Sequence, residues 1–401
     1  MLFNALKKSG SSINSSHDLL QQISYGNLSI AGVSITPETA MRYAPVYACI
    51  KVLQETVGQL PFFLYEKKGN NKLHAQDHPL YPLLKVAPND FQTSQEWREM
   101  IVAHLCLRGN QYNWINRVGE KVVEYIPLNT DSVSVRQESD YTLKYDVRFK
   151  DGSSKTFDAK DILHFKIGSL DGITGRSIIS QGRDSIGLGV AAQKYGSKLF
   201  TNGGRPSGLL STEADLGPEK AKILSEEWEK TQGGENVSST AVLWGGLKYD
   251  QIALSAGDAQ FLETRKFQRS EIAGMFRVPP HLIGDLDKAT FSNIEHQWLS
   301  FLNAGLESWF RRIESGIDHK LLKKSEQAKY YSQLKRNALL RGDTKARSEF
   351  YGKLFNIGVL NANEIRRLED MNERSDEGGE EYYVQLNMSN GDDDKTDEGK
   401  S

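Results

Sequence analysis

The sequence has only two cysteines among its 401 residues, which limits the chemistry that it can carry. Cys49 and Cys106 stand in the apolar contexts VYACIKV and AHLCLRG, so we expect two buried, reduced thiols in a cytoplasmic chain. Two cysteines without clustered histidines do not form a zinc site. The sequence therefore predicts neither a disulfide framework nor a metal centre.

Long apolar runs are also missing. No stretch approaches the roughly 18 apolar residues that a membrane-spanning helix needs. The N-terminal segment MLFNALKKSGSSINSSHDLLQQ has two lysines but no apolar core of signal-peptide length behind them. We predict no membrane partner and no export, and we interpret residues 1–37 as a mobile leader.

The charge is nearly balanced, with a formal net value of −2. Proteins that bind DNA tightly usually carry a basic surface, because Lys and Arg release counterions from the phosphates. Any contact of this chain with DNA is therefore expected to be loose. Residues 373–401 hold ten acidic and three basic residues, which leaves the rest of the chain about five charges positive. We interpret this segment as a disordered acidic tail; a cation site is the alternative.

The sequence lacks the short motifs of catalysis. It contains no GxxxxGK[ST], GxSxG, HExxH or CxxC pattern. Asp161 and His164 lie three residues apart, but no nucleophile or metal ligand accompanies them, so we expect a surface histidine on a strand edge. The glycine-rich Asn202–Arg205 follows no strand and reads as a turn. We predict no catalytic residue and no cofactor.

The apolar periodicity predicts an α+β fold. A helix begins at Thr36-Pro37 and ends at Gly58, with a kink or a split at Pro45. A second helix covers residues 93–107. After it, alternating apolar and polar residues predict five strands: QYNWINR, VVEYIPL, SVSVRQ, LKYDVRF and ILHFKIG.

The second half of the sequence is mainly helical. Helices are predicted for residues 175–200, 258–277 and 293–322, and an insertion with short strands and one helix fills residues 201–256. The longest helix carries a continuous apolar stripe and must pack along a large surface. Two further helices follow, capped by Asp343 and by Asn361 or Asn363.

Glycines interrupt the predicted helix over residues 175–200, and each interior glycine lowers helix stability by about 1 kcal/mol relative to alanine. The interior positions are Gly182, Gly187, Gly189 and Gly196. Small residues let two backbones approach closely. The partner can be another helix of the same chain or the same helix in a neighbouring subunit, and spacing alone does not decide between them.

Several segments in a fixed order resemble the portal proteins of long-tailed bacteriophages, of the short type. They run from TPETAMRYAPVYACIKVLQETVGQLPFFLY through GNQYNWINR, IPLNTDSVSV and DILHFK, then GRSIISQGRDSIGLGVAAQKYGSKLF, EIAGMFRVPPHLIG with SNIEHQ, and NEIRRLE. The resemblance covers roughly residues 36–388. Met371-Asn372 stands where relatives often have prolines, which leaves the end of the last domain open.

The resemblance implies a portal fold with a wing, a helical stem, a clip and a crown, assembled into a ring with a central channel. The expected parts are the wing at 38–175 and 293–336, the stem helices at 176–200 and 258–280, the clip at 201–257, the tunnel loop at 281–292 and the crown at 337–372.

The resemblance also assigns expected site residues. The tunnel loop would face DNA with Asp285, Asp287, Lys288, Thr290, Ser292 and Asn293. The stem would pack against neighbouring subunits at Gly182, Gly187, Gly189 and Gly196, and the clip would dock the terminase with Glu219, Lys222, Glu226 and Trp228. A channel that lets DNA slide should avoid base readout, and a loop with two acids beside one lysine suits that requirement.

The implied function is a twelve-subunit ring at one capsid vertex, through which double-stranded DNA is packaged and ejected. The expected partners are other copies of the chain, DNA without sequence preference, the large terminase subunit, the head–tail adaptor, and the major capsid and scaffold proteins. The expected location is the virion, and the host cytoplasm during assembly. Two other functions stay open: a DNA-processing enzyme of the head region, and a capsid or scaffold component without a DNA channel.

Overall fold

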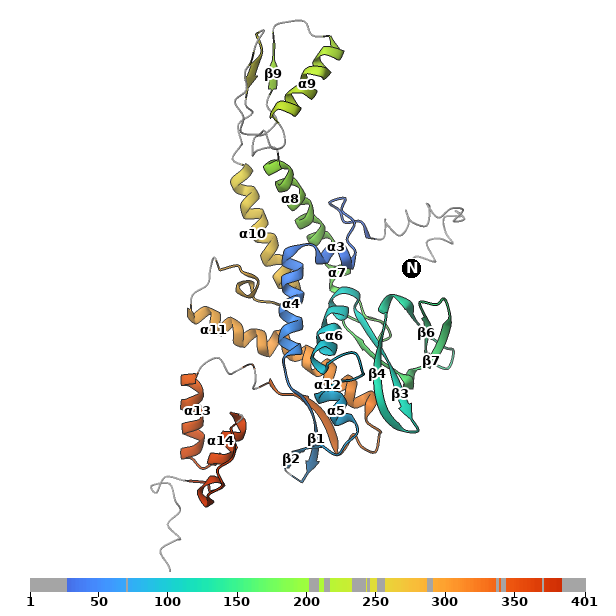
Figure 1. Cartoon of the computed structure of the whole chain (residues 1–401), viewed down its shortest axis with the longest axis vertical. Helices are drawn as coiled ribbons and strands as arrows, with labels where there is room; N and C mark the ends of the chain where they lie inside the picture. Colours follow the sequence, from blue (N-terminus) through green and yellow to red (C-terminus); the bar gives the residue numbers. More distant parts are fainter. Residues whose placement is uncertain are drawn as a thin grey trace, which may run out of the picture. The chain divides into compact units, whose positions relative to one another are not determined.

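The structure is a computed structural model (Figure 1). It describes residues 27–69, 71–201, 209–212, 217–232, 243, 246–250, 257–286, 291–336, 339, 344–369 and 371–383. The chain forms two compact units, Met1–Leu334 and Lys335–Ser401. Most of the predicted leader, residues 1–26, lies outside the described residues, as do Asn202–Arg205 and the last part of the tail, 384–401.

Two helices that pack on each other form the first core of the larger unit. α3 (Pro37–Met41) and α4 (Ala44–Gly58) are separate helices, because Pro45 occupies the first turn of α4, which confirms the predicted split. α4 packs on α6 (Ser94–Arg108), whose Thr93 forms a capping box with Glu96. Both free cysteines are fully buried in these two helices, as predicted.

Three small antiparallel sheets surround this core. β1 (Phe62–Lys68) lies between β2 (Asn71–His74) and β11 (Tyr330–Leu334), and α5 (Leu80–Lys85) packs on β1. β3 (Asn110–Val118) lies between β4 (Lys121–Leu128) and β8 (Ile162–Lys166). β6 (Leu143–Arg148) lies between β5 (Val133–Gln137) and β7 (Ser154–Asp158).

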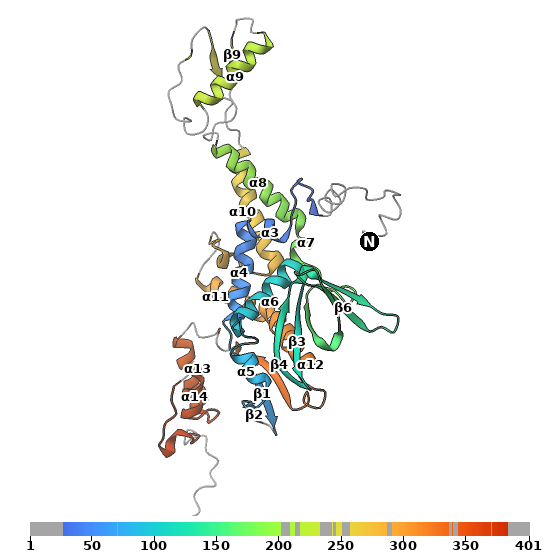
Figure 2. The same cartoon turned by 45° about the vertical axis from the view of Figure 1, so that its right-hand side comes forward.

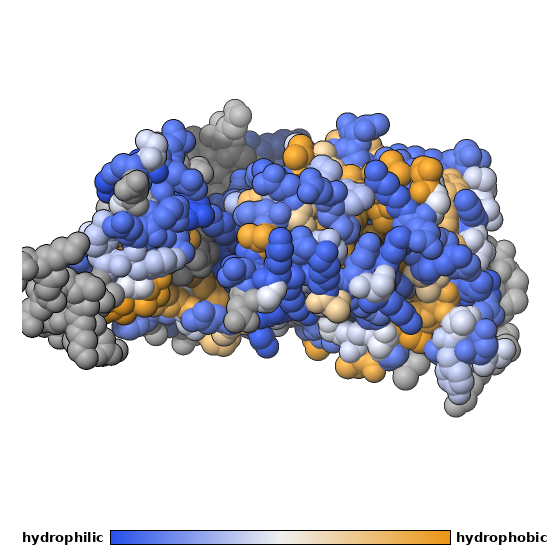
Figure 3. All heavy atoms as spheres, turned by 90° about the horizontal axis from the view of Figure 1, so that it is seen from below, coloured by the Kyte–Doolittle hydropathy of each residue, from blue (hydrophilic) through white to orange (hydrophobic). Residues whose placement is uncertain are grey.

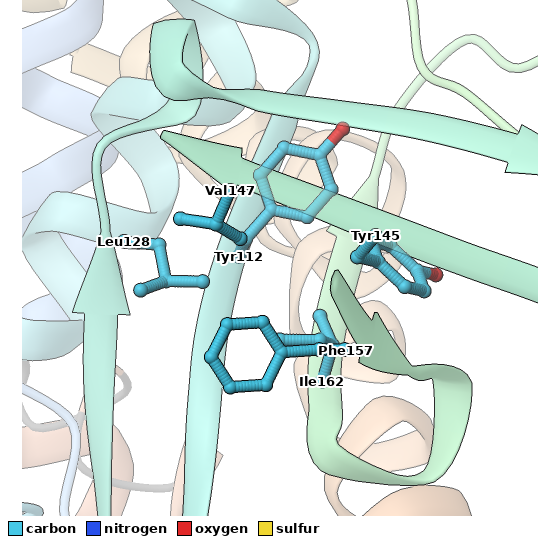
Figure 4. Packing of buried hydrophobic residues seen from close by; sticks show 6 residues of the cluster. All are labelled: Tyr112, Leu128, Tyr145, Val147, Phe157 and Ile162. Carbon is cyan, nitrogen blue, oxygen red and sulfur yellow. The ribbon is translucent and has the colours of Figure 1, made fainter. Parts of the chain in front are cut away.

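The five predicted strands are present, but they belong to two different sheets. The second of these sheets also contains β7, a strand that the alternation did not predict. β7 reads SKTFD, with only Phe157 buried, so its sequence resembles a polar loop. The two sheets meet in an apolar cluster to which five strands contribute (Figure 4). Its buried members are Tyr112, Leu128, Tyr145, Val147, Phe157 and Ile162.

The predicted long helix is present as α11 (Phe291–Ser300), a π-helical stretch (Phe301–Leu306) and α12 (Glu307–Leu321). Its buried stripe includes Phe310, Ile313 and Ile317, and α12 packs on β8 and β11. The π-helical turn was not predicted. It coincides with Gly305, whose hypothetical Cβ would lie 3.2 Å from the carbonyl oxygen of Arg277, so the wider turn accommodates a close backbone approach.

Two helices lie side by side next to this core in both views (Figures 1 and 2). α8 (Arg183–Thr201) follows the short α7 (Ile178–Gln181), and α10 (Gly257–Phe276) returns along it. The prediction that this helix begins at Gly175 is wrong: Ser177 caps α7 and Gly182 separates α7 from α8. In the sequence, three elements lie between α8 and α10: β9 (Leu209–Ser211), α9 (Pro218–Gln232) and β10 (Lys248–Asp250). β9 and β10 form an antiparallel pair.

The smaller unit contains α13 (Thr344–Asn356), α14 (Ala362–Leu368) and a 3-10 turn (Glu377–Gly379). Asn361, not Asn363, caps α14 in a capping box with Glu364. The predicted cap Asp343 lies outside the described residues.

The predicted start of a disordered tail at residue 373 is wrong for its first part. Asn363 donates from Nδ2 to Glu380 (3.0 Å) and to the carbonyl of Arg374 (3.2 Å), which fixes residues 374–380 against α14. In the part of the chain that the structure describes, no helix is long and apolar enough to cross a membrane. Seen from below, apolar side chains reach the surface in several separate patches (Figure 3).

Candidate functional site

A double-glycine contact joins the β3 sheet to the helix pair α8 and α10. Gly109, with a left-handed φ of 75°, ends α6, and Gly175 lies directly against it. A Cβ on Gly175 would collide with the carbonyl oxygen of Gly109, and a Cβ on Gly109 would lie 2.6 Å from the backbone nitrogen of Ser177. Only glycine fits at these two positions, because both obstacles are backbone.

Asn110 holds this junction from the side. Its Oδ1 accepts from the backbone N–H of Gly175 (2.7 Å), and its Nδ2 donates to the carbonyl of the same residue (3.0 Å). His164 lies 2.9 Å from the same Oδ1 through Nε2 and 3.3 Å from the Tyr145 hydroxyl through Nδ1. Nε2 therefore carries the proton and Nδ1 accepts from the phenol.

The expectation of a strand edge at His164 is confirmed, since β8 is an edge strand of its sheet, but the side chain is half-buried and not on the surface. Its ring packs 4.3 Å from that of Tyr112, centroid to centroid. Burial is the main cause that lowers the pKa of His164 to about 3, and Lys166 and Lys320 lower it further. The ring is thus neutral and forms part of the packed junction. Asp161 instead pairs with Arg117 at 3.4 Å.

The helix pair α8 and α10 is the centre of the predicted stem. Ile186 of α8 and Ile272 and Ala273 of α10 are fully buried, and Ser185 Oγ donates to Glu271 at 2.8 Å. The segment before α3 also packs on α8, where Asp184 accepts from the backbone N–H of Ile30 at 2.9 Å.

Three of the four predicted stem glycines have close neighbours within their own chain. A Cβ on Gly182 would enter the side chain of Met275, one on Gly187 would enter Ser29, and one on Gly189 would lie 2.6 Å from Cζ of Tyr43. Packing inside the subunit therefore already limits the residue size at Gly187 and Gly189, whereas the flexible end of Met275 can move away from Gly182. Gly196 is also buried. Contact of the four glycines with a neighbouring subunit stays a prediction.

The variant Gly187→Val distinguishes packing of this glycine inside the subunit from packing against a neighbouring subunit. We expect the isolated subunit to lose about 1–3 kcal/mol of stability, because the valine displaces Ser29 and the chain around it from α8. Urea unfolding of the monomer measures this loss, and Gly274→Ala, at an open position on α10, is the matched control. A Gly187→Val monomer of wild-type stability whose rings fail to form would instead place the contact between subunits.

The predicted tunnel loop begins where α10 ends. Arg277 has a positive φ of 56°, and a 3-10 turn (Pro280–Ile283) leads to Gly284. Asp285 is half-buried, and its backbone N–H donates to the carbonyl of Pro280 at 3.0 Å. Asn293, on α11, is exposed and accepts from Gln297 at 3.2 Å. The other predicted positions, Asp287, Lys288, Thr290 and the side chain of Ser292, lie outside the described residues.

A groove of about 390 Å³ that the sequence did not indicate lies beside this turn. Val278, Pro279, Pro280 and Phe301 form most of its apolar lining, and Gln297 stands at one side. His281 lies 2.8 Å from Gln297, which fixes the turn to α11.

The predicted clip residues all lie on α9. Glu219, Lys222 and Glu226 are exposed, and Lys222 and Glu226 form a wide i,i+4 ion pair of 4.0 Å. Trp228 is half-buried and packs on Tyr249 of β10 at 5.2 Å between ring centroids. The insertion thus holds its helix to its strand pair by an aromatic contact and presents charged side chains to solvent.

The titratable groups of the described residues do not converge on a reaction centre. Within those residues no three of His, Cys, Asp and Glu gather in a way that would hold a metal ion. Burial raises the pKa of Cys49 to about 12 and also raises that of Cys106, so both thiols stay protonated. The functional features of the described residues are therefore the exposed side of α9, the turn after α10 and the tightly packed junction at Gly109 and Gly175.

These features define an α+β protein in which a helix pair leads from a layered core to a charged insertion. Residues 44–370 match the family described as phage portal protein. The chain is 31% identical to a probable portal protein of Streptomyces phage phiC31, covering 90% of this chain and 82% of that one. It is 30% identical to the portal protein of Enterobacteria phage HK97, covering 84% and 81%. The chain belongs to the phage portal protein family.

Solved structures share the fold. One is a chain from the virion of a native gene transfer agent particle, with a TM-score of 0.58 at 23% identity, covering 84% of this chain and 93% of that one. Another is an HK97-family phage portal protein from Corynebacterium diphtheriae, with a TM-score of 0.57 at 16% identity, covering 76% and 96%. These likenesses confirm the predicted portal fold.

Proposed function

We propose that the protein is the subunit of a dodecameric ring at one capsid vertex, the channel through which double-stranded DNA enters and leaves. The observation that carries this proposal is the family match over residues 44–370, from the start of α4 to two residues beyond α14. It includes every element on which a ring subunit would depend: the layered core, the helix pair and the turn after α10. Related structures include the neck of a native gene transfer agent particle computed with C12 symmetry and that of an empty particle computed with C6 symmetry.

In this proposal the parts take defined roles. Residues 38–175 and 293–336 form the wing, α8 and α10 the stem, 201–257 the clip, 281–292 the tunnel loop, and 337–372 the crown. The polar contacts of residues 374–380 with α14, and the contact of Tyr383 with Phe355, support a crown that extends to about residue 383. The subunit performs no chemistry, needs no cofactor and has no membrane partner.

The contact with DNA is proposed to be weak and independent of sequence. The net charge of −2 and the acidic Asp285 and Asp287 beside Lys288 support this, since a dense row of cations would hold the phosphates and oppose sliding. The exposed charges of α9 are proposed to meet the large terminase subunit during packaging and the head–tail adaptor afterwards. The major capsid and scaffold proteins are proposed as further partners of the ring, at the vertex where the capsid is nucleated.

Electron microscopy of the purified full-length chain, with mass photometry of the same sample, tests the proposal. The expected result is a closed ring of about twelve subunits, with a channel wider than the B-form duplex. A compact low-order oligomer without a channel at any concentration would overturn it in favour of a capsid or scaffold component. A divalent-cation-dependent nuclease assay on the same sample, expected to be negative, tests for a DNA-processing enzyme.

A further inference from the structure

Among the described residues of the smaller unit, no large apolar side chain is fully buried. Across Thr344–Leu368 and residues 371–383, as far as they are described, the buried residues are Asn361, Asn363 and Gly379. The two asparagines are held by polar bonds to Glu380, Glu364 and Arg374. The apolar residues of the helix pair, such as Leu354, Phe355 and Ile365, are only half-buried. The pair therefore has less hydrophobic stabilisation than a folded domain usually has.

The exposed large apolar residues described in this unit are Phe350, Ile357, Val359, Met371, Tyr382 and Tyr383, and four of them form two flanks. The first, here the Phe350 flank, consists of Phe350 (56% exposed), Lys353 and Ile357 (51% exposed). Ile357 directly follows α13, and its backbone N–H still donates to the carbonyl of Lys353 at 3.2 Å, as in a helix. Phe350 and Ile357 are seven positions apart, close to two helical turns, so they lie on the same side.

The second flank, here the tyrosine flank, consists of Tyr382 (54% exposed), Tyr383 (46% exposed) and Glu381. Tyr383 packs on Phe355 at 5.6 Å between centroids. Phe355 is five positions beyond Phe350, which places it about 140° further around α13. The two flanks therefore point in different directions.

The two flanks are also complementary in charge. The Phe350 flank carries the ammonium group of Lys353, whereas the tyrosine flank carries the carboxylate of Glu381, beside Glu380. In the sequence, residues 344–368 hold five basic and two acidic residues, and residues 369–383 hold one basic and seven acidic residues. Two different and complementary faces on one unit are what a ring contact requires, because each subunit meets its two neighbours through different surfaces.

We propose that the Phe350 flank of one subunit packs on the tyrosine flank of the next, so that neighbouring copies of this chain bury each other's exposed apolar side chains. The proposal rests on the proposed ring and adds to it the surfaces that close it at the C-terminal unit. The occupant is a second copy, since the same chain carries both halves of the contact. The rim pair of Lys353 and Glu381 sets the direction in which the subunits follow one another.

Cross-linking in the full-length chain tests this contact. Ile357→Cys and Tyr382→Cys place one thiol on each flank, and a short bismaleimide joins them, while Cys49 and Cys106 are fully buried. We expect the double variant to give a ladder of covalent oligomers up to the closed ring, and each single variant to give none. The pair Glu349→Cys with Tyr382→Cys is the matched control, because Glu349 is exposed about 100° away from Phe350 on α13.

The outcomes separate this contact from the ring itself. Intact rings by electron microscopy without a ladder, or a cross-link confined to the monomer, would overturn the flank contact and leave the proposed function standing. The absence of rings in the unmodified protein would overturn both. As a second measurement, Phe350→Ser is expected to speed hydrogen exchange of residues 344–383 in assembled rings at least tenfold, whereas Glu349→Gln leaves it unchanged. Equal exchange in the two variants would contradict the proposal even if the rings persist.

Discussion

Gly175→Ala is expected to destabilise the subunit by at least about 3 kcal/mol, enough to leave little soluble protein. The added Cβ would fall on the carbonyl oxygen of Gly109 and 2.8 Å from that of Ile167. Both are backbone atoms of packed elements, so no side-chain rotation relieves the collision. The carbonyl of Gly109 also accepts from the backbone N–H of Ile167 at 2.9 Å, and Gly175 is bound on both sides by Asn110.

Urea unfolding and soluble yield measure this effect, and two other glycines calibrate it. Gly109→Ala should be comparably severe, since it adds the strain of a positive φ to a collision with Arg176. Gly152 also has a positive φ, 84°, but a Cβ there would meet nothing within 4 Å, so Gly152→Ala should cost only about 1 kcal/mol. Similar losses in Gly152→Ala and Gly109→Ala would mean that backbone strain, and not the junction contact, explains both.

The different roles of these glycines show which features the sequence alone could predict and which it could not. Local signals are decided by a few neighbouring residues, and they predicted the split at Pro45, the start of α6 at Thr93 and the length of the stripe in α11 and α12. Gly109 and Gly175 are 66 residues apart, and no local pattern indicates that they touch. The same reason hides the partners of Gly187 and Gly189, which lie in the segment before α4.

The apolar periodicity of the sequence also could not predict features that depend on tertiary packing. β7 has one buried residue in five, so its strand is set by pairing with β6 and not by its own alternation. Residues 374–380 look like a polar tail, but buried asparagines on α14 bind their backbone and Glu380. Of the candidate site, the resemblance located the helix pair, the turn after α10 and the exposed charges of α9. The groove lined by Pro279 and Phe301 forms only when α11 folds back on that turn.

Acidification is expected to destabilise the junction through His164. The pKa of this residue is about 3 in the folded subunit, and its ordinary value is about 6.5. Because the folded pKa is lowered, the neutral ring contributes stability that is fully present above about pH 6.5 and is lost as the pH falls from there toward 3. At pH 5 the expected loss from this residue is about 2 kcal/mol. Burial lowers the pKa of His78 and His104 too, so they act in the same direction.

His164→Gln isolates this contribution, since glutamine can hydrogen-bond to Asn110 and Tyr145 but does not titrate. The free energy of unfolding in urea, followed by tryptophan fluorescence, should fall by about 2 kcal/mol more for the wild type than for the variant between pH 7.5 and pH 5. The comparison cancels the remaining histidines and the carboxylates, which both proteins share. Equal losses in the two proteins would mean that His164 accepts its proton without leaving the junction. In that case the Tyr145 hydroxyl would have to turn from donor to acceptor inside the folded sheet.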